Sequence, residues 1–166
     1  MSKKPAVLVA MALASALALS GCGIGFNAGT SQQKASGNGL VANVDALQIR
    51  GMTIVADTKN PTSGVIIGTI INTADTDNAL VGVAAARTVV AVGTINVALP
   101  AKSSTQLNTA AETTVALNGQ LTPGTYQNVQ LMFADGKSIP ASLMVVPNDG
   151  NYAETVFPAP APSTTP

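Results

Sequence analysis

The sequence predicts an all-β fold, an antiparallel β-sandwich of about seven or eight strands. Short runs rich in Val, Ile and Thr recur between residues 44 and 147, and each run ends at a turn signal of Gly, Asn, Asp or Pro. The only helix-like window is residues 84–87, which is too short to form a helix alone. Aromatic residues make up only 3% of the chain, so we expect a core of Val, Ile, Leu and Ala.

Each expected strand is a short, mostly aliphatic run bounded by turn residues. In chain order, the runs are Leu47–Ile49, Thr53–Val55, Gly64–Ile71, Leu80–Val83, Thr88–Leu99, Thr113–Leu117, Val129–Phe133 and Ile139–Val146. Gly51 and Met52 separate the first two runs. Gly93 interrupts the long fifth run, and Pro100 ends it. Residues 72–78 are rich in Asn, Asp and Thr, which predicts a turn.

The last two runs predict a β-hairpin whose register is selected by the apolar pattern. A two-residue turn would place the apolar residues of the two strands on opposite faces. A three-residue loop, Asp135–Lys137, pairs Phe133 with Ile139 and Leu131 with Ala141, and it places both apolar sets on one face. We therefore predict this loop, with its glycine in the left-handed conformation that such loops use.

The first 21 residues have the pattern of a signal peptide. Lys3 and Lys4 form a basic start, and the run from Pro5 to Leu19 carries no charge. This run is shorter than the about 20 apolar residues that a helix needs to cross a bilayer. We therefore expect export followed by removal of residues 1–21.

The residues Leu19, Ser20, Gly21 and Cys22 resemble the lipobox of bacterial lipoproteins. That box consists of an aliphatic residue, two small residues and the cysteine that receives diacylglycerol. The resemblance implies lipidation of Cys22 and anchoring on the extracytoplasmic face of the cell membrane, because several acyl chains hold a protein more durably than one. The alternative is an ordinary secretory signal followed by a chance cysteine.

The remaining chain divides into three expected parts. Residues 22–43 begin with the lipidated cysteine and continue as a flexible tether, because Gly, Ser, Asn and Gln predominate there. Residues 44–147 form the β-sandwich domain. Residues 148–166 are expected to be a disordered tail, since the chain reads FPAPAPSTTP from position 157.

Composition excludes several classes of chemistry. The chain has no His and one Cys, so it has no imidazole base and cannot form an intrachain disulfide. Without Lys3 and Lys4, 6 of its 8 basic residues remain beside 8 acidic ones, a net charge of −2 that does not suit nucleic acid. We expect no cofactor. The membrane is the one partner that the sequence indicates, and it identifies neither a protein partner nor a small ligand.

Several turn and strand segments between residues 64 and 147 match a known pattern. They are Gly68–Thr73, Leu80–Val83, Val97–Ala101, Leu117–Leu121, Pro123–Gly124 and the final hairpin. In these segments the chain resembles the PCu(A)C family of extracytoplasmic copper chaperones, and in particular its actinobacterial lipoprotein branch. The resemblance covers about half of the chain. It implies a cupredoxin-like or immunoglobulin-like β-sandwich.

The copper site of that family does not carry over to this sequence. The family uses two histidines and two methionines near one end of the sandwich. One His-x-Met pair falls at Thr114–Ala116, and the other His and Met fall within residues 86–95, which contain neither. We therefore expect no metal ligands of the family type.

Three methionines follow the expected leader: Met52, Met132 and Met144. Thioethers bind Cu(I), so a substitute site is conceivable. In the register above, however, Met132 and Met144 lie four residues, or about 13 Å, apart along one sheet face. We expect all three to be packing residues.

Two other groups of polar residues stand out. Asp75 and Asp77 form an oxygen-rich loop with neighbouring asparagines, but the loop lacks the Gly and Glu of an EF-hand, so we expect turn chemistry and not a Ca²⁺ site. The hydroxyls of Ser103–Thr105 have no histidine to activate them.

These observations favour a non-enzymatic, lipid-anchored protein of the cell envelope that has a binding or scaffolding role without copper. The alternative is an extracytoplasmic copper chaperone that uses non-standard ligands. An envelope hydrolase is disfavoured, because no candidate nucleophile has a base.

Overall fold

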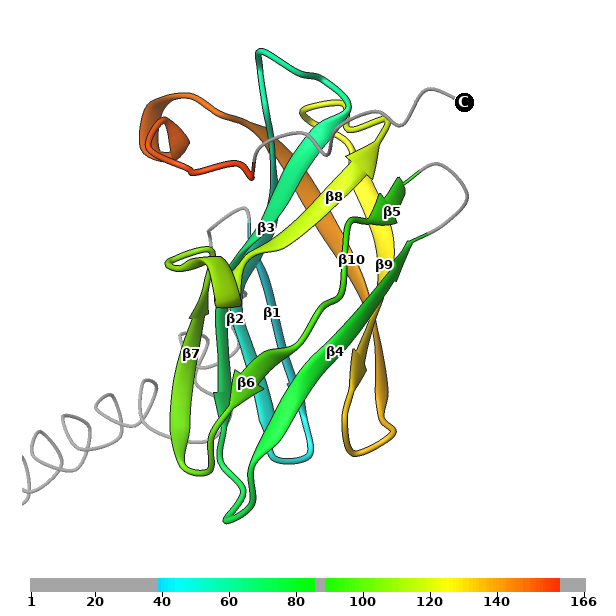
Figure 1. Cartoon of the computed structure of the whole chain (residues 1–166). Helices are drawn as coiled ribbons and strands as arrows, with labels where there is room; N and C mark the ends of the chain where they lie inside the picture. Colours follow the sequence, from blue (N-terminus) through cyan, green and yellow to red (C-terminus); the bar gives the residue numbers. More distant parts are fainter. Residues whose placement is uncertain (1–38, 86–88, 159–166) are drawn as a thin grey trace, which may run out of the picture. The chain divides into compact units, whose positions relative to one another are not determined.

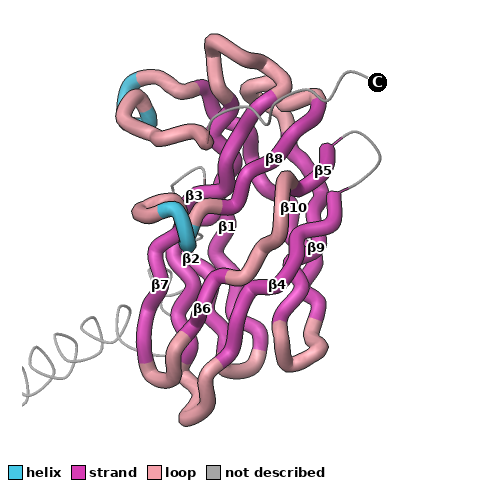
Figure 2. Tube along the Cα trace, viewed as in Figure 1, coloured by secondary structure: helices cyan, strands magenta, loops and turns pink. Residues whose placement is uncertain are grey.

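A computed structural model describes residues 39–85 and 89–158, which form a curled β-sandwich (Figure 1). The ten strands are β1 (Leu40–Val44), β2 (Leu47–Ala56), β3 (Ser63–Asn72), β4 (Asn78–Ala85), β5 (Val89–Ala91), β6 (Val97–Leu99), β7 (Ser103–Leu107), β8 (Val115–Gly119), β9 (Tyr126–Phe133) and β10 (Ser138–Pro147). Two short 3-10 turns complete the fold, η2 (Ala111–Thr113) and η3 (Gly150–Tyr152), shown in cyan in Figure 2. The expected signal peptide, lipobox and Cys22 lie outside the described residues.

Neighbouring strands follow the order β5-β8-β3-β2-β10-β9-β4-β6, with β1 paired to β2 and β7 paired to β3. All pairs are antiparallel except β2 with the end of β10. Strand β5, at one end of this path, also lies beside β4 near the other end, so the sheet nearly closes on itself. The prediction of an all-β antiparallel sandwich is confirmed, although the described residues form ten strands and not seven or eight, and one pair is parallel.

Strand β10 joins the two layers of the sandwich. Its first part pairs with β9, and Val145–Pro147 then pair in parallel with Ile54–Ala56 of β2. At this junction, the buried hydroxyl of Thr53 donates a 2.6 Å hydrogen bond to the carbonyl of Met144. Strand β10 is thus hydrogen-bonded to a strand of each layer, which fixes the two layers relative to each other.

The structure corrects the expected strand list. The first two runs form the single strand β2, and within the fifth run β5 and β6 are separate strands. Two further strands were not expected. Residues 40–43, assigned above to the tether, belong to β1. Residues 103–107 form β7, a polar edge strand whose alternating exposure leaves most of its hydroxyl and amide side chains near solvent. Both strands pair on one side only. Strand β7 lacks an aliphatic run, whereas β1 has a short one, LVANV, whose Leu40, Ala42 and Val44 are partly buried against the core.

The last hairpin has a three-residue loop, but the predicted register was wrong by two residues. Leu131 pairs with Ile139, and the loop is Ala134–Gly136. Gly136, at φ +82°, is the last residue of this loop, the position that such hairpins reserve for a left-handed residue. A shift of two residues preserves the faces, so Leu131 and Leu143 are buried as the apolar pattern required.

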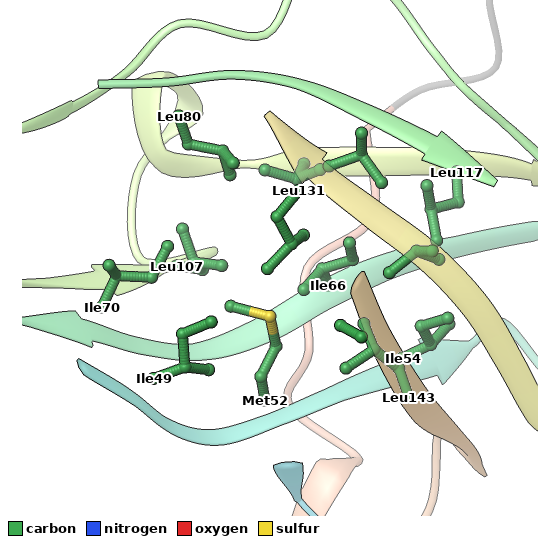
Figure 3. Packing of buried hydrophobic residues seen from close by; sticks show 14 of the residues in the cluster. Ile49, Met52, Ile54, Ile66, Ile70, Leu80, Leu107, Leu117, Leu131 and Leu143 are labelled. Carbon is green, nitrogen blue, oxygen red and sulfur yellow. The ribbon is translucent and has the colours of Figure 1, made fainter. Parts of the chain in front are cut away.

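Aliphatic side chains from both layers form the main core, in which Met52 lies among Ile49, Ile54 and Leu131 (Figure 3). A second, smaller cluster lies on the outer side of β2, β3 and β10, where Val55, Val65 and Val146 are buried.

A C-terminal strap, residues 148–158, covers this second cluster. Its side chains Tyr152 and Phe157 pack there, and the Asn148 N–H donates to the carbonyl of Ala56 at 3.1 Å. The expectation of a disordered tail therefore does not hold for residues 148–158. Residues 159–166 lie outside the described residues.

Across the two described ranges, we find no helix that combines the length and apolar character needed to traverse a bilayer.

Candidate functional site

The candidate site is a groove beside β5 and β8, which we call the β5–β8 groove. It has a volume of about 410 Å³, within the usual range for ligand pockets. Three chain segments far apart in the sequence form it. The lining residues are Val92, Asn108, Thr109, Ala110, Ala111, Thr114, Ala116, Val156 and Pro158.

The groove lies where the family resemblance places the copper ligands. In the resemblance described above, Thr114 and Ala116 fall at the His-x-Met positions and Val92 falls within the window 86–95, and all three line the groove. The backbone N–H of Val92 donates to the carbonyl of Ala116 at 2.9 Å, which continues the β5–β8 pairing by one residue. The structure therefore brings the two expected ligand segments together, but with aliphatic and hydroxyl side chains.

The walls of the groove are mostly apolar. Val92 is 42% exposed and Val156 is 71% exposed, so both are among the few large apolar side chains that face solvent in the described structure. Val90 of β5, which lies two residues before Val92 in the chain, is 63% exposed. From β5, the chain runs across the front of the sandwich to β6 (Figure 2). This concentration of exposed aliphatic groups around a hollow is typical of an interaction site.

The opposite wall is a loop around η2 whose polar side chains bond mainly within the loop. The hydroxyl of Thr113 accepts hydrogen bonds from the backbone N–H groups of Thr109 and Ala110, at 3.1 and 3.0 Å. The hydroxyl of Thr114 donates to the Ala110 carbonyl at 2.8 Å, and Asn108 has the positive φ of +60° that closes the turn. These contacts rigidify the loop.

The groove offers little reactive chemistry. None of its lining side chains is charged, and none is His, Cys or Met. The Thr109 hydroxyl donates to the Gln106 carbonyl at 3.2 Å and lies 3.3 Å from the Thr113 hydroxyl, and none of the residues that line the groove has a carboxylate or amine side chain to act as a base. Such a lining suits the binding of an uncharged ligand.

The structure does not bring the three methionines together. Met52 is fully buried in the core, whereas Met132 is 38% exposed on the outer face of β9 and covers Gly82. Met132 pairs with Ser138, and Met144 pairs with Tyr126. Along β9, residues 126 and 132 are six residues apart, which corresponds to about 20 Å and not the 13 Å of the expected register. All three serve packing, with Met144 beside the second cluster.

The acidic loop between β3 and β4 is a hydrogen-bonded turn. The buried side chain of Asn72 donates to the carbonyls of Thr76 and Leu99, each at 2.9 Å, and accepts from the Ala74 N–H at 3.0 Å. Asp77 accepts from the Ala101 N–H at 2.9 Å. Over the described ranges, no three His, Cys, Asp or Glu side chains are grouped to hold a metal ion.

One charged contact links two turns far from the groove. Lys137 lies 2.8 Å from Asp45 of the β1–β2 turn and 3.6 Å from Asp135. The hydrogen bond from Lys137, together with its positive charge, holds the pKa of Asp45 below its usual value. The hydrogen bond to Asp45 raises the pKa of Lys137 in turn. All three side chains are at least one-third exposed, so this contact ties the turns together without forming a site.

Sequence reasoning did not identify the groove itself. Val156 and Pro158 fell in the part expected to be disordered, and Asn108–Ala111 carry no motif. The available signal was the density of Thr and Asn in the segment NTAAETT, which is typical of a side-chain-bonded turn. The lipobox residues Leu19, Ser20, Gly21 and Cys22 lie outside the described residues, so the anchor stays a prediction.

No protein-family model matches the sequence, and no curated protein matches it. Solved structures do match. The copper-bound PCuAC domain from PmoF2 shares 18% identity over 65% of this chain and 98% of that chain, with a TM-score of 0.52. The apo PCuAC domain from PmoF1 shares 18% identity over 64% and 98%, with a TM-score of 0.53. The described domain therefore has a PCuAC-like fold, as the resemblance implied.

Proposed function

We propose that this protein is a lipid-anchored component of the cell envelope that uses a PCuAC-like sandwich to bind an uncharged partner in the β5–β8 groove. In this proposal, the protein is not an enzyme and does not carry copper. One observation carries the proposal: the groove is lined by Val92, Thr114 and Ala116, which lie in the two segments where the resemblance places the family's copper ligands.

The donor set of the groove does not fit copper. Copper held against competing cellular ligands needs several converging thiolate, thioether or imidazole groups. The chain has no His, its one Cys belongs to the predicted anchor, and Met132 and Met144 lie about 20 Å apart on a sheet face outside the groove. A chaperone with non-standard ligands would need a cluster of soft donors, and the described residues provide none.

The lining also argues against catalysis. A hydrolase needs a nucleophile beside a base, and the groove has only threonine hydroxyls and one carboxamide as polar side chains. The apolar walls and the rigid threonine loop instead favour shape-selective binding of a neutral ligand.

Support for the anchor comes from the sequence. The basic start, the uncharged run and the Leu19–Cys22 box stand in the order that lipoprotein processing requires. Residues 23–38 then link the acylated cysteine to the described domain, which would stand on the extracytoplasmic face.

Titration with Cu(I) under a competing chelator tests the central claim. The mature protein should form no one-to-one complex that survives the chelator. A stable complex that is lost on substitution of Met52, Met132 or Met144 would instead establish the chaperone alternative. The sample should begin at residue 22 with Cys22→Ser, because a free thiol would bind Cu(I) itself.

A further inference from the structure

We propose that the β5–β8 groove is a binding site for an extended proline–alanine segment, and that Ala159–Pro162 of the same chain is its resident occupant. The inference deepens the proposed function, because it names what the groove binds. It also implies that an external ligand must displace this segment. The groove, the strap and the sequence after Pro158 carry the argument.

The strap ends at the groove. Val156 and Pro158 are themselves part of the groove lining, so the chain leaves the described structure at the groove wall. The strap is fixed behind that point, because Tyr152 and Phe157 pack onto the second cluster and Asn148 is bonded to Ala56. From Pro158, four residues of polyproline-type chain reach about 12 Å. The segment therefore starts in contact with its proposed site.

The segment and the groove are chemically complementary. Residues 159–162 read Ala-Pro-Ala-Pro and carry no charge, as the groove lining carries none. Proline has no N–H, so the segment can lie against apolar walls without burying an unpaired donor at every second residue. Its carbonyl groups can accept hydrogen bonds from the Asn108 carboxamide. A charged or strongly polar segment would lose its hydration here without compensation.

The loss of conformational entropy on docking is small for this segment. Proline restricts the free segment, so less conformational freedom is lost on docking than for an ordinary chain. The segment is also joined directly to the groove wall, which gives an effective concentration in the millimolar range or above. A weak contact is therefore sufficient for occupancy. Docking would cover Val92 and Val156, which are otherwise exposed to an unusual degree for valine.

A spin label on the tail tests the proposal. The mature protein with Cys22→Ser and Ser163→Cys carries a single nitroxide just after the segment. We expect strong broadening of the methyl signals of Val92, Ala110 and Ala116, relative to the reduced label. Weak broadening spread evenly over the domain would overturn the proposal.

Two matched variants separate specific docking from proximity. Ala110→Trp fills the groove and should abolish the selective broadening, whereas Ala134→Trp, at another exposed alanine in the β9–β10 loop, should leave it unchanged. Equal effects of the two variants would contradict the assignment. The folded state of each variant is checked from its dispersed methyl spectrum.

A mixed sample identifies the source of the occupant. Isotope-labelled protein without nitroxide is combined with unlabelled, spin-labelled protein, so that only contacts between molecules broaden signals. We expect no selective broadening at the groove. If it appears, the occupant belongs to a second copy and the intramolecular assignment is wrong. A groove that binds neither tail while the protein still fails to hold Cu(I) would refute this inference and leave the proposed function standing.

Discussion

The backbone N–H of Val92 donates a 2.9 Å hydrogen bond to the carbonyl of Ala116, and this bond joins the two segments in which the resemblance places copper ligands. The backbone arrangement suited to a shared site is therefore present. The side chains at these positions are those of a neutral groove. The first prediction follows from this separation of scaffold and ligands.

Restoring soft donors at the groove should create copper binding. The triple variant Val92→Met, Thr114→His and Ala116→Met places three ligands, two thioethers and one imidazole, on adjoining segments, so we expect Cu(I) affinity at least tenfold above wild type, or about 1.4 kcal/mol. Chelator competition measures it. The control Gln130→His creates the same His-x-Met spacing with Met132 on the exposed face of β9, without a third donor, and should gain less. Equal gains would mean that the groove geometry is irrelevant.

The stabilities of two alanine variants test which face of the β9–β10 hairpin is buried. Leu131 is fully buried, so Leu131→Ala should lower the free energy of unfolding by about 2–5 kcal/mol. Gln130 is its exposed neighbour on the same strand, and Gln130→Ala should lower the free energy of unfolding by about 0.5 kcal/mol or less. Urea denaturation of the two variants decides the matter, and the reverse order of stabilities would be incompatible with the register.

Asn72 should be a structural residue of the β3–β4 turn. Its side chain is 2% exposed and makes three hydrogen bonds to backbone groups, so Asn72→Ala leaves buried polar groups without partners. We expect a loss of about 2–3 kcal/mol in the free energy of unfolding. Asn118→Ala, at an exposed position of β8, is the control and should stay within about 0.5 kcal/mol of wild type. Similar losses in both would show that the turn does not depend on Asn72.

The Asp45–Lys137 contact should give a small pH dependence. The pKa of Asp45 is lowered, so its stabilising effect exists above the usual aspartate pKa and is lost as pH falls through the lowered value. The pKa of Lys137 is raised, so its share is lost only as pH rises through that raised value in the alkaline range. The Tm difference between wild type and Asp45→Asn should thus be present near neutrality and vanish in acid. A carboxyl NMR titration in which Lys137→Met leaves the Asp45 pKa unchanged would refute the pairing.

Cys22→Ser should block lipidation and leave unprocessed or mislocalised protein. The reason is that the thiol is the group acylated in the box that Leu19–Cys22 resembles. Metabolic labelling with a radiolabelled fatty acid measures the effect. Equal incorporation into wild type and variant would remove the basis for the anchor.

The strands that the sequence indicated are those with aliphatic faces. Runs such as 64–71 and 139–146 were found because one side of each strand must be apolar to form the core. Strand β7 was missed because it is a largely polar edge strand, and β1 was missed because its short LVANV run directly follows a segment rich in Gly, Ser and Asn. The hairpin loop was placed one residue late, since apolar alternation is unchanged by a shift of two and only the left-handed position of Gly136 distinguishes the two registers.

By itself, the sequence determined the all-β class and the faces of the last hairpin. These depend on residue identity and on alternation along the chain, which are local properties. Only the tertiary structure decided that β10 serves both layers, that the strap covers Val146, and that Val92, Thr114 and Pro158 line one groove. Those relations join residues dozens of positions apart. Such contacts depend on how the two layers close around the core, which a periodic pattern in one segment does not specify.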